Sequence, residues 1–219
     1  MATERLGDSY GGFRTRLVET LRSQGIRDLA VLKAFSEVPR HLFVPPALLH
    51  RAYEDAALPI GGGQTISRPF TQARSLEVLR LCGEERVLEV GTGSGYQAAL
   101  LGRLASQVFT VERLSGLARA ALATLRATGA GNVTVLAGDG TLGWSSLAPF
   151  DAIVVAAAGP IVPEPLLDQL TAEGRLLMPL GPEGSQRLIL ARRGPQGVHH
   201  VDLDAASFVP LLGRHGAAE

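Results

Sequence analysis

The chain has 219 residues, of which 46% are hydrophobic and 19% are charged, which is the composition of an ordinary globular protein. Its 21 basic residues balance 21 acidic ones, so there is no field of one sign to attract nucleic acid or an anionic membrane. No segment approaches the roughly 18 to 20 apolar residues of a membrane span, and the N-terminus lacks the apolar core of a signal peptide, so we expect a cytoplasmic protein without membrane partners.

Two helices are predicted at the start of the chain, because apolar residues recur at helical spacing over residues 12–24 and 28–36. Three prolines, at positions 39, 45 and 46, then interrupt the pattern. Residues 58–69 read LPIGGGQTISRP, a glycine-rich segment bounded by prolines. This composition favours an ordered loop with a function of its own. A further helix is predicted at about 71–81.

Strand and helix patterns alternate after this point. Strands are predicted at 86–90, 107–112, 133–137 and 151–155, with helices at 95–105 and 114–128. Such alternation predicts a doubly wound, mostly parallel sheet with helices on both faces. Further strands are predicted at 176–180, 187–191, 199–203 and 207–212, and we expect them to add antiparallel strands to one edge. We expect one domain, 1–219, with helices and a loop in 1–70, the central core in 71–180 and the last strands in 181–219.

Some side chains are predicted to have structural or minor roles only. The single cysteine, Cys82, lies in an apolar context and is expected to be buried. Arg40 and Arg51 are expected to form exposed pairs with nearby acidic residues, which contribute little. The adjacent histidines 199 and 200 have no cysteine or carboxylate partner at metal-binding spacing, so we expect no metal.

The most informative segment is VLEVGTGSGYQAALL, residues 87–101, which combines a short apolar run, closely spaced glycines and a helical pattern. A strand, a glycine turn and a helix N-terminus form a cradle for a nucleotide-like cofactor. The dinucleotide pattern G-x-G-x-x-G would require a third glycine where Tyr96 stands. The observed pattern, Glu89 followed by Gly91, Gly93 and Gly95, is instead typical of S-adenosylmethionine-dependent methyltransferases. Glu112 ends the next apolar segment, where a carboxylate can accept both ribose hydroxyls.

The chain resembles the protein-L-isoaspartate (D-aspartate) O-methyltransferase family over nearly its whole length. The matching blocks are VPRHLFVP (38–45), LPIGGGQTIS (58–67), the glycine segment (87–101), FTVER (109–113), NVTVLAGDGTLGW (132–144), APFDAIVV (148–155) and FVPL (208–211). The GQTIS and GDGTLGW blocks, in this order and at these separations, distinguish this family from other methyltransferases. The resemblance implies a Rossmann-like class I methyltransferase fold.

The resemblance also implies an activity. The family transfers the methyl group of S-adenosylmethionine to the free carboxylate of L-isoaspartyl residues, which arise in proteins by spontaneous damage, so isoaspartyl proteins and peptides are the expected partners. The acceptor carboxylate is ionised at neutral pH and needs no general base. We expect the protein to act as a monomer.

Roles carry over by resemblance onto individual residues. Ser67 is assigned to the active site as a hydrogen-bonding group and not as a covalent nucleophile, and Thr65 and Ile66 are expected to shape the same pocket. Among the cofactor residues, Glu89 is expected to brace the glycine loop more than to touch the ligand. The others are Gly91, Gly93 and Gly95 against the methionine and ribose, Glu112 on the ribose, and Asp139 with the Gly140 backbone at the adenine.

Purely structural roles are the alternative interpretation of some of these residues. From the residues alone, Ser67 and Asp139 also fit side chains that stabilise their own turns. Ala57, Arg68 and Ser207 depart from the usual family pattern, which leaves substrate preference open. The alternative activities are methylation of ordinary aspartate in a dedicated peptide partner, a regulatory protein that keeps the fold, and a nicotinamide-dependent dehydrogenase.

Overall fold

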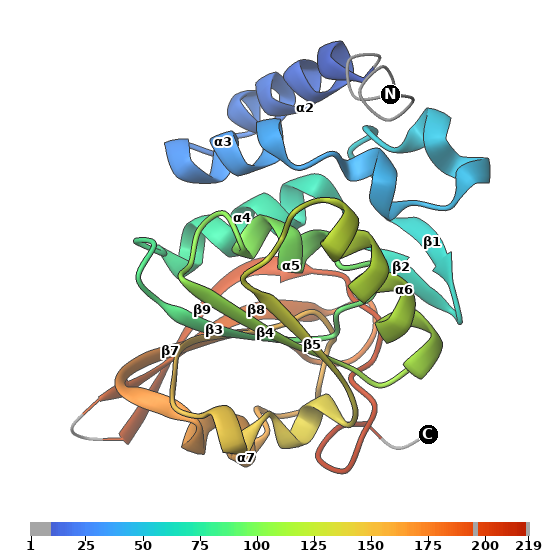
Figure 1. Cartoon of the computed structure of the whole chain (residues 1–219). Helices are drawn as coiled ribbons and strands as arrows, with labels where there is room; N and C mark the ends of the chain where they lie inside the picture. Colours follow the sequence, from blue (N-terminus) through green and yellow to red (C-terminus); the bar gives the residue numbers. More distant parts are fainter. Residues whose placement is uncertain (1–9, 195–196, 218–219) are drawn as a thin grey trace.

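The protein is represented by a computed structural model that describes residues 10–194 and 197–217. A seven-stranded sheet in the order β5-β4-β3-β6-β7-β8-β9 lies at its centre (Figure 1). The strands are β3 (Arg86–Val90), β4 (Gln107–Glu112), β5 (Val133–Ala137), β6 (Phe150–Val155), β7 (Leu170–Leu180), β8 (Gln186–Gly194) and β9 (Gly197–Ala206). The pairs from β5 through β7 are parallel, and β8 and β9 are antiparallel additions at one edge.

The strand order creates a crevice. The chain runs from β3 outward to β4 and β5, and then returns to place β6 on the other side of β3. At such a switch point the loops that follow neighbouring strands diverge, which leaves a binding crevice at the carboxyl ends of the strands. The glycine turn follows β3 at this place.

Alternating side chains divide the core between the two faces of the sheet. On β3, Val87 packs into the cluster that includes Val108 of β4, whereas Leu88 packs on the opposite face with Phe109. Because both faces are apolar, helices cover both. The predicted doubly wound α/β architecture, with leading helices and antiparallel C-terminal strands, is confirmed.

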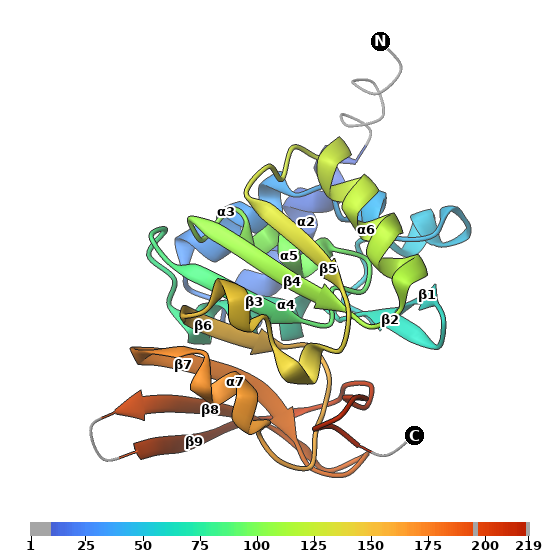
Figure 2. The same ribbon diagram turned by 60° about the horizontal axis from the view of Figure 1, so that its bottom comes forward.

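The helices form two layers over one face and a thin layer over the other (Figures 1 and 2). The first face carries α4 (Pro69–Leu79), α5 (Tyr96–Leu101) and α6 (Ser115–Ala127), with α2 (Gly11–Ser23) and α3 (Leu29–Glu37) packed above them. The second face carries α7 (Glu164–Asp168). Four 3-10 helices complete the elements: η1 (Arg40–Phe43), η2 (Pro46–Arg51), η3 (Gly140–Leu142) and η4 (Ser145–Leu147).

Residues that favour helix N-termini explain where the helices start. The Asp28 carboxylate accepts hydrogen bonds from the backbone N–H groups of Ala30 and Val31, at 2.8 and 3.1 Å, and so caps α3. Pro69 is the first residue of α4, where its missing N–H costs nothing. The prolines that interrupt the early helical pattern coincide with η1 and η2.

Residues 58–69 were expected to form an ordered loop, but most of them form a β-hairpin. Strand β1 (Leu58–Gly61) pairs antiparallel with β2 (Gln64–Ile66). The three glycines at 61–63 take positive φ angles of 92°, 59° and 71° through the turn. The glycines that suggested a loop therefore supply the sharp reversal between two short strands.

The segment 207–212 was predicted as strand and is not one. It makes only isolated bridges, including one between Pro210 and Ala158. Proline has no N–H to donate to a ladder, and the N–H and C=O of Phe208 are bonded to the side chain of Gln186, so regular pairing is blocked. The helix predicted to run to 105 ends at Leu101, and β7 begins six residues before the predicted start at 176.

The prediction of a buried Cys82 was wrong. The residue is exposed, because it lies in the turn between α4 and β3. The backbone N–H of Cys82 donates to the Glu85 carboxylate at 2.9 Å, which holds this turn against the start of the sheet.

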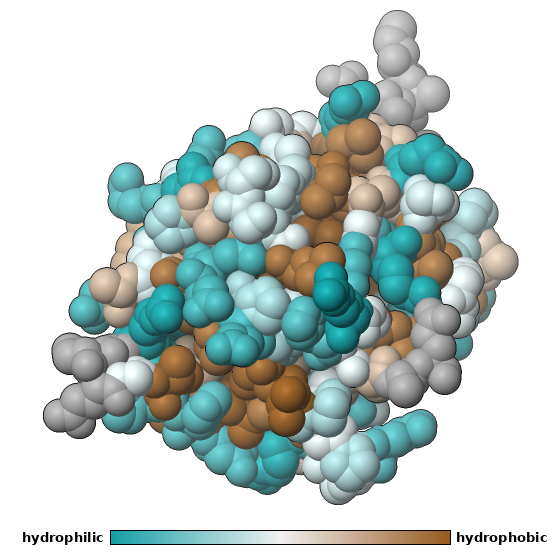
Figure 3. Space-filling model, turned by 90° about the horizontal axis from the view of Figure 1, so that it is seen from below, coloured by the Kyte–Doolittle hydropathy of each residue, from teal (hydrophilic) through white to brown (hydrophobic). Residues whose placement is uncertain are grey.

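The surface of the α7 side is mixed. Figure 3 shows brown hydrophobic groups set among teal hydrophilic ones on this face. None of the described helices combines the length and apolar character that crossing a lipid bilayer requires.

Candidate active site

A pocket lies over the glycine turn at the carboxyl ends of β3 and β4. Gly91 and Gly93 line it, with φ angles of 95° and 53°, a region that favours glycine. A Cβ on Gly93 would lie 3.3 Å from Ile60 of the hairpin, so the turn and the hairpin approach closely. Gly95 is not among the lining residues. It has a φ of 88° and precedes α5, and a Cβ there would lie 3.3 Å from Ala121 and Leu125 of α6.

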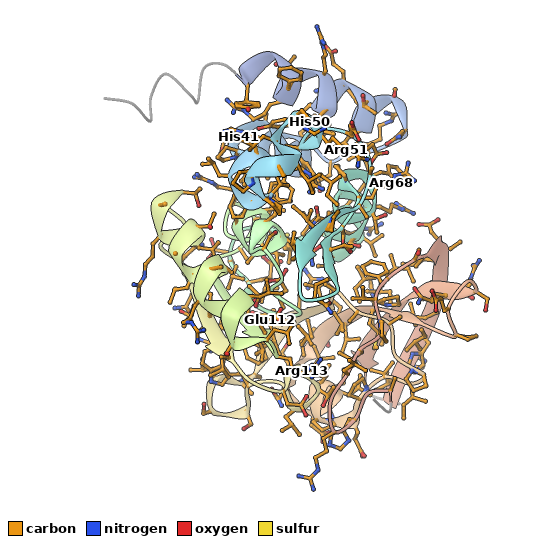
Figure 4. The ribbon with its side chains drawn as sticks, turned by 90° about the vertical axis from the view of Figure 1, so that its right-hand side faces the viewer. His41, His50, Arg51, Arg68, Glu112 and Arg113 are labelled. Carbon is orange, nitrogen blue, oxygen red and sulfur yellow. The ribbon has the colours of Figure 1, made fainter. Side chains whose placement is uncertain are left out.

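Glu112 lies at the end of β4 on the pocket wall (Figure 4). Its side chain is 6% exposed. One carboxylate oxygen accepts the N–H of Gly93 at 2.8 Å and the other accepts the N–H of Leu114 at 2.9 Å. Each oxygen keeps a lone pair for another donor, so the carboxylate fits a ligand with two neighbouring hydroxyl groups, such as a ribose.

Glu89 lies behind the turn, fully buried and not among the pocket-lining residues. Thr110 donates its hydroxyl to the Glu89 carboxyl group at 2.6 Å, and the Thr110 and Thr92 hydroxyls are 2.6 Å apart. Burial raises the pKa of Glu89 to about 8, while the contacts with Thr110 and Gln97 oppose that rise. Glu89 therefore reaches the glycine turn through two threonine hydroxyls, as a neutral acid at pH 7.

Asp139 caps η3 and anchors the C-terminal segment. Its Oδ1 accepts the N–H and the hydroxyl of Thr141, at 2.9 and 2.7 Å, and its Oδ2 accepts the N–H of Arg214 at 2.8 Å. These hydrogen bonds lower the pKa of Asp139 against the opposing effect of burial. A carboxylate has about four acceptor positions, so one remains unused, but Asp139 is not among the residues that line the pocket. Gly140, beside it, lines the pocket, and a Cβ there would lie 2.5 Å from Val90.

The hairpin supplies the other wall of the pocket. Thr65, Ile66 and Ser67 all line the pocket, and Thr65 and Ser67 also line a larger groove beside it. The hairpin turn reaches the start of α6, since a Cβ on Gly62 would lie 3.0 Å from Leu114 (Figure 4). Residues 65–67 therefore stand between the pocket and the groove.

The groove runs between the hairpin side and the C-terminal segment, and its lining includes Ser207, Phe208 and Val209. Gln186, 5% exposed, holds that segment by accepting the Phe208 N–H at 2.7 Å and donating to the Phe208 carbonyl at 3.0 Å. Arg68 also lines the groove and pairs with Asp55 at 2.7 Å. The three positions that depart from the family pattern, Ala57, Arg68 and Ser207, thus line the groove and not the pocket over the glycine turn.

Sequence reasoning was wrong about Arg40, which is fully buried. Its guanidinium donates to the carbonyl oxygens of Ala52 and Ser67, at 2.9 and 2.8 Å, and to the Gln72 side-chain oxygen at 3.1 Å. Burial lowers its pKa to about 10, so it stays charged at neutral pH. The only sequence signal of this role is that Arg40 lies within the mostly apolar segment VPRHLFVP. That signal does not indicate which groups the guanidinium binds. Arg51, by contrast, forms the expected exposed pair with Glu54, at 2.8 Å.

Comparisons with known proteins agree with this geometry. The model of the family described as protein-L-isoaspartate(D-aspartate) O-methyltransferase matches residues 13–216. The chain belongs to this family.

The relatives share about half of their residues with the chain. A protein-L-isoaspartate O-methyltransferase 1 of Syntrophobacter fumaroxidans is 51% identical over 93% of this chain and 95% of its own length. A protein-L-isoaspartate O-methyltransferase of Methylorubrum extorquens is 52% identical over 94% of this chain and 91% of its own length.

Solved structures extend the likeness to three dimensions. A protein-L-isoaspartate O-methyltransferase superposes with a TM-score of 0.85 at 29% identity, covering 93% of this chain and 67% of the other. A protein of this type from Plasmodium falciparum, solved in complex with S-adenosyl-L-homocysteine, gives a TM-score of 0.80 at 25% identity over 90% of this chain and 97% of its own.

Proposed function

We propose that the chain transfers the methyl group of S-adenosyl-L-methionine to the free carboxylate of L-isoaspartyl residues in damaged proteins and peptides, which starts their repair. One observation carries this proposal beyond family membership. The same hairpin wall, with Ser67 at its end, lines both the pocket over the glycine turn and the open groove. A site for a methyl donor therefore meets a site for a peptide along one wall, at Thr65 and Ser67.

The pocket residues suit the methyl donor. The glycine turn leaves room for a ligand against its backbone, and Glu112 keeps acceptor positions for ribose hydroxyls. The Plasmodium falciparum relative binds the demethylated product of the same donor on the same fold. When bound, the donor supplies an electrophilic methyl group on a sulfonium sulfur.

The chemistry requires alignment more than acid or base. A bond forms between a carboxylate oxygen and the methyl carbon while the carbon–sulfur bond breaks, and its electron pair stays on sulfur. The products are a methyl ester and S-adenosylhomocysteine, and no proton moves. Because a carboxylate with a pKa near ~4 is already ionised, the protein contributes by holding the oxygen, carbon and sulfur in line, worth up to roughly 7–11 kcal/mol.

Methyl transfer from tritiated S-adenosylmethionine to paired peptides tests the proposal. The peptides differ only in an aspartyl or an isoaspartyl linkage at one residue. We expect label in the isoaspartyl peptide alone. Equal labelling of both would favour the alternative, methylation of ordinary aspartate in a peptide partner, and labelling of neither would contradict methyl transfer to peptides.

Three finer statements stay predictions. They are acceptance of D-aspartyl residues, a monomeric state and a cytoplasmic location. Competition with a D-aspartyl peptide tests the first statement, and light scattering, which gives the molecular mass in solution, tests the second. Fractionation of cells tests the third.

A further inference from the structure

Arg40 carries a buried positive charge that makes no direct ion pair with a carboxylate among the described residues, although the Asp55 carboxylate attracts it from a greater distance. The guanidinium is fully buried, and none of the ion pairs within residues 10–194 and 197–217 includes it. Its described partners are two backbone carbonyls and one side-chain amide, with the ring of Tyr96 at 4.8 Å. Burying a charge is costly unless it is compensated, so these acceptors, together with the more distant Asp55 carboxylate, hold the guanidinium in one place behind the pocket wall.

The chemistry of arginine also fixes the orientation of Gln72. A guanidinium has only donors, so the Gln72 atom at 3.1 Å from Arg40 is the amide oxygen. The amide nitrogen is then the end left for a ligand. Gln72 is 4% exposed and lines the same pocket as Ser67, so this donor is almost buried in the pocket wall that Ser67 also forms.

Arg40 links the two pocket residues. One guanidinium nitrogen donates to the carbonyl of Ser67, at the end of the hairpin, and another donates to Gln72, in the first turn of α4. A change in the position of Arg40 therefore displaces both residues together. Its contact with Ala52 anchors the guanidinium from the other side.

We propose that the Gln72 amide donates a hydrogen bond to the isoaspartyl carboxylate, and that Arg40 is the positioning residue that aims this amide and holds Ser67 beside it. This inference rests on the proposed function. The donor holds one carboxylate oxygen, which leaves the other to attack the methyl carbon. A carboxylate is also present on the methionine part of the cofactor. We assign the amide to the substrate because the same guanidinium ties it to Ser67, which borders the peptide groove.

The first test replaces Gln72. The variant Gln72→Leu removes the donor at similar size, and we expect the KM for an isoaspartyl peptide to rise about tenfold, since a hydrogen bond to a charged group is lost. The dissociation constant of S-adenosylhomocysteine, measured by calorimetry, should change less than about twofold. Gln107→Leu makes the same chemical change at an exposed residue that does not line the pocket, and should leave both constants unchanged.

Two outcomes overturn the assignment. An unchanged peptide KM removes Gln72 from substrate binding, and a parallel rise in the S-adenosylhomocysteine dissociation constant assigns the amide to the cofactor carboxylate. The wild-type assay with the same peptide stands apart, because absence of methylation there would contradict the proposed function itself.

A second variant keeps the test valid if the leucine variant folds poorly. Gln72→Glu has the same shape but offers an acceptor in place of a donor when ionised. We expect a larger rise in the peptide KM than for leucine, because Arg40 keeps the new carboxylate ionised and this charge repels the substrate carboxylate. A rise no larger than that of the leucine variant contradicts a direct contact.

A double-mutant cycle tests the positioning role of Arg40. Lysine keeps the charge but cannot reach three acceptors in one plane. We expect Arg40→Lys to raise the peptide KM about fivefold in the wild type and less than about twofold in the Gln72→Leu background, because the amide that it aims is gone. Arg40→Lys should lower thermal stability in both backgrounds, and by less in Gln72→Leu, where the hydrogen bond between the two side chains is already lost. Equal KM effects in both would show that Arg40 acts only through general stability.

Discussion

Ser67 is fixed through its backbone and also lines the two hollows of the site. Its backbone carbonyl is held by Arg40, and the residue borders both the cofactor pocket and the groove. A residue whose backbone is fixed in this way presents its side chain without having to be ordered when substrate binds, which lowers the entropic cost of binding.

We predict that Ser67→Ala lowers kcat for the isoaspartyl peptide by about tenfold or more, because a hydrogen bond to the reacting carboxylate is lost. S-adenosylhomocysteine should bind as in the wild type, since the substitution leaves the Arg40 contact with the backbone carbonyl in place. Steady-state kinetics and calorimetry check the two parts. A weakened cofactor complex with normal kcat would move Ser67 out of the substrate site.

For Glu112 we predict that a substitution weakens cofactor binding and leaves peptide binding unchanged, which is the reverse of the prediction for Ser67. Glu112→Gln keeps one acceptor oxygen but replaces the other with a donor, which would face the N–H of Gly93 or Leu114. We expect the dissociation constant of S-adenosylhomocysteine to rise at least about tenfold. The peptide KM at saturating methyl donor should be nearly unchanged, and a selective effect on the peptide would contradict the ribose assignment.

Individual roles were harder to predict from the sequence than motifs. The glycine pattern and Glu112 follow a strand, so their common location could be foreseen from the topology of a parallel sheet. The partners of Arg40 and Gln186 could not, because they lie in segments whose pairing depends on long-range packing. Burial of a cation between apolar neighbours has no local signature that separates it from a surface arginine.

At the scale of elements, β3 and β4 hold an acid inside the sheet. Glu89 pairs with Thr110 across the two strands and faces the side of the sheet that carries α5, where Gln97 contacts it. Because its hydroxyl partners connect to the glycine turn, the strands transmit the position of one buried carboxyl group to the cofactor pocket.

This acid makes the stability of the protein depend on pH. Burial raises the pKa of Glu89 from 4.5 to about 8 in the folded state. Between these values the unfolded chain releases the proton and the folded protein keeps it, so the free energy of unfolding falls as the pH rises through this range.

We therefore predict that the free energy of unfolding falls less between pH 5 and pH 8 in Glu89→Gln than in the wild type. The difference in stability between the two proteins should shift in favour of Glu89→Gln as the pH rises over this range. Urea unfolding at several pH values measures this. The exposed Asp202→Asn serves as the matched acid-to-amide control and should follow the wild type. Parallel curves for Glu89→Gln and the wild type would contradict a raised pKa.

The C-terminal segment is an element without regular secondary structure that still has a defined place. Gln186 replaces the missing strand partner by bonding to both backbone groups of Phe208. The apolar residues of 207–212 predicted a strand, and the competition of a side chain for the Phe208 backbone groups explains why none forms.

We predict that Gln186→Leu destabilises the protein by about 1–3 kcal/mol, because the Phe208 backbone groups lose their partners. The groove wall should loosen, which raises the peptide KM several-fold while S-adenosylhomocysteine binding stays constant. Thermal unfolding and peptide kinetics measure the two effects. An unchanged peptide KM would show that the groove does not bind the peptide.

At the scale of the whole molecule, the last described residues fold back onto the cofactor side. The N–H of Arg214 bonds to Asp139, and the N–H of His215 bonds to the Thr141 hydroxyl at 3.1 Å. Segments more than 70 positions apart in the sequence thus meet at the predicted adenine end of the pocket.

Gly213 permits this contact, because a Cβ there would collide with the Asp139 carboxylate and its φ is 149°. We predict that Gly213→Ala separates the two segments and weakens S-adenosylhomocysteine binding several-fold, as measured by calorimetry. Gly184→Ala is the control, since its φ of 82° brings similar backbone strain but its Cβ would meet nothing within 4 Å. Equal behaviour of the two variants would show that the contact with Asp139 does not matter.

The exposed Cys82 offers a practical route to these measurements. It is the only cysteine in the sequence and lies just before β3, at the end of the strand opposite to the glycine turn. A five-residue strand spans about 17 Å, so a dye attached to this thiol stays away from both pocket and groove. The unaltered protein can therefore be labelled at one site, and the binding of large damaged proteins followed by fluorescence anisotropy.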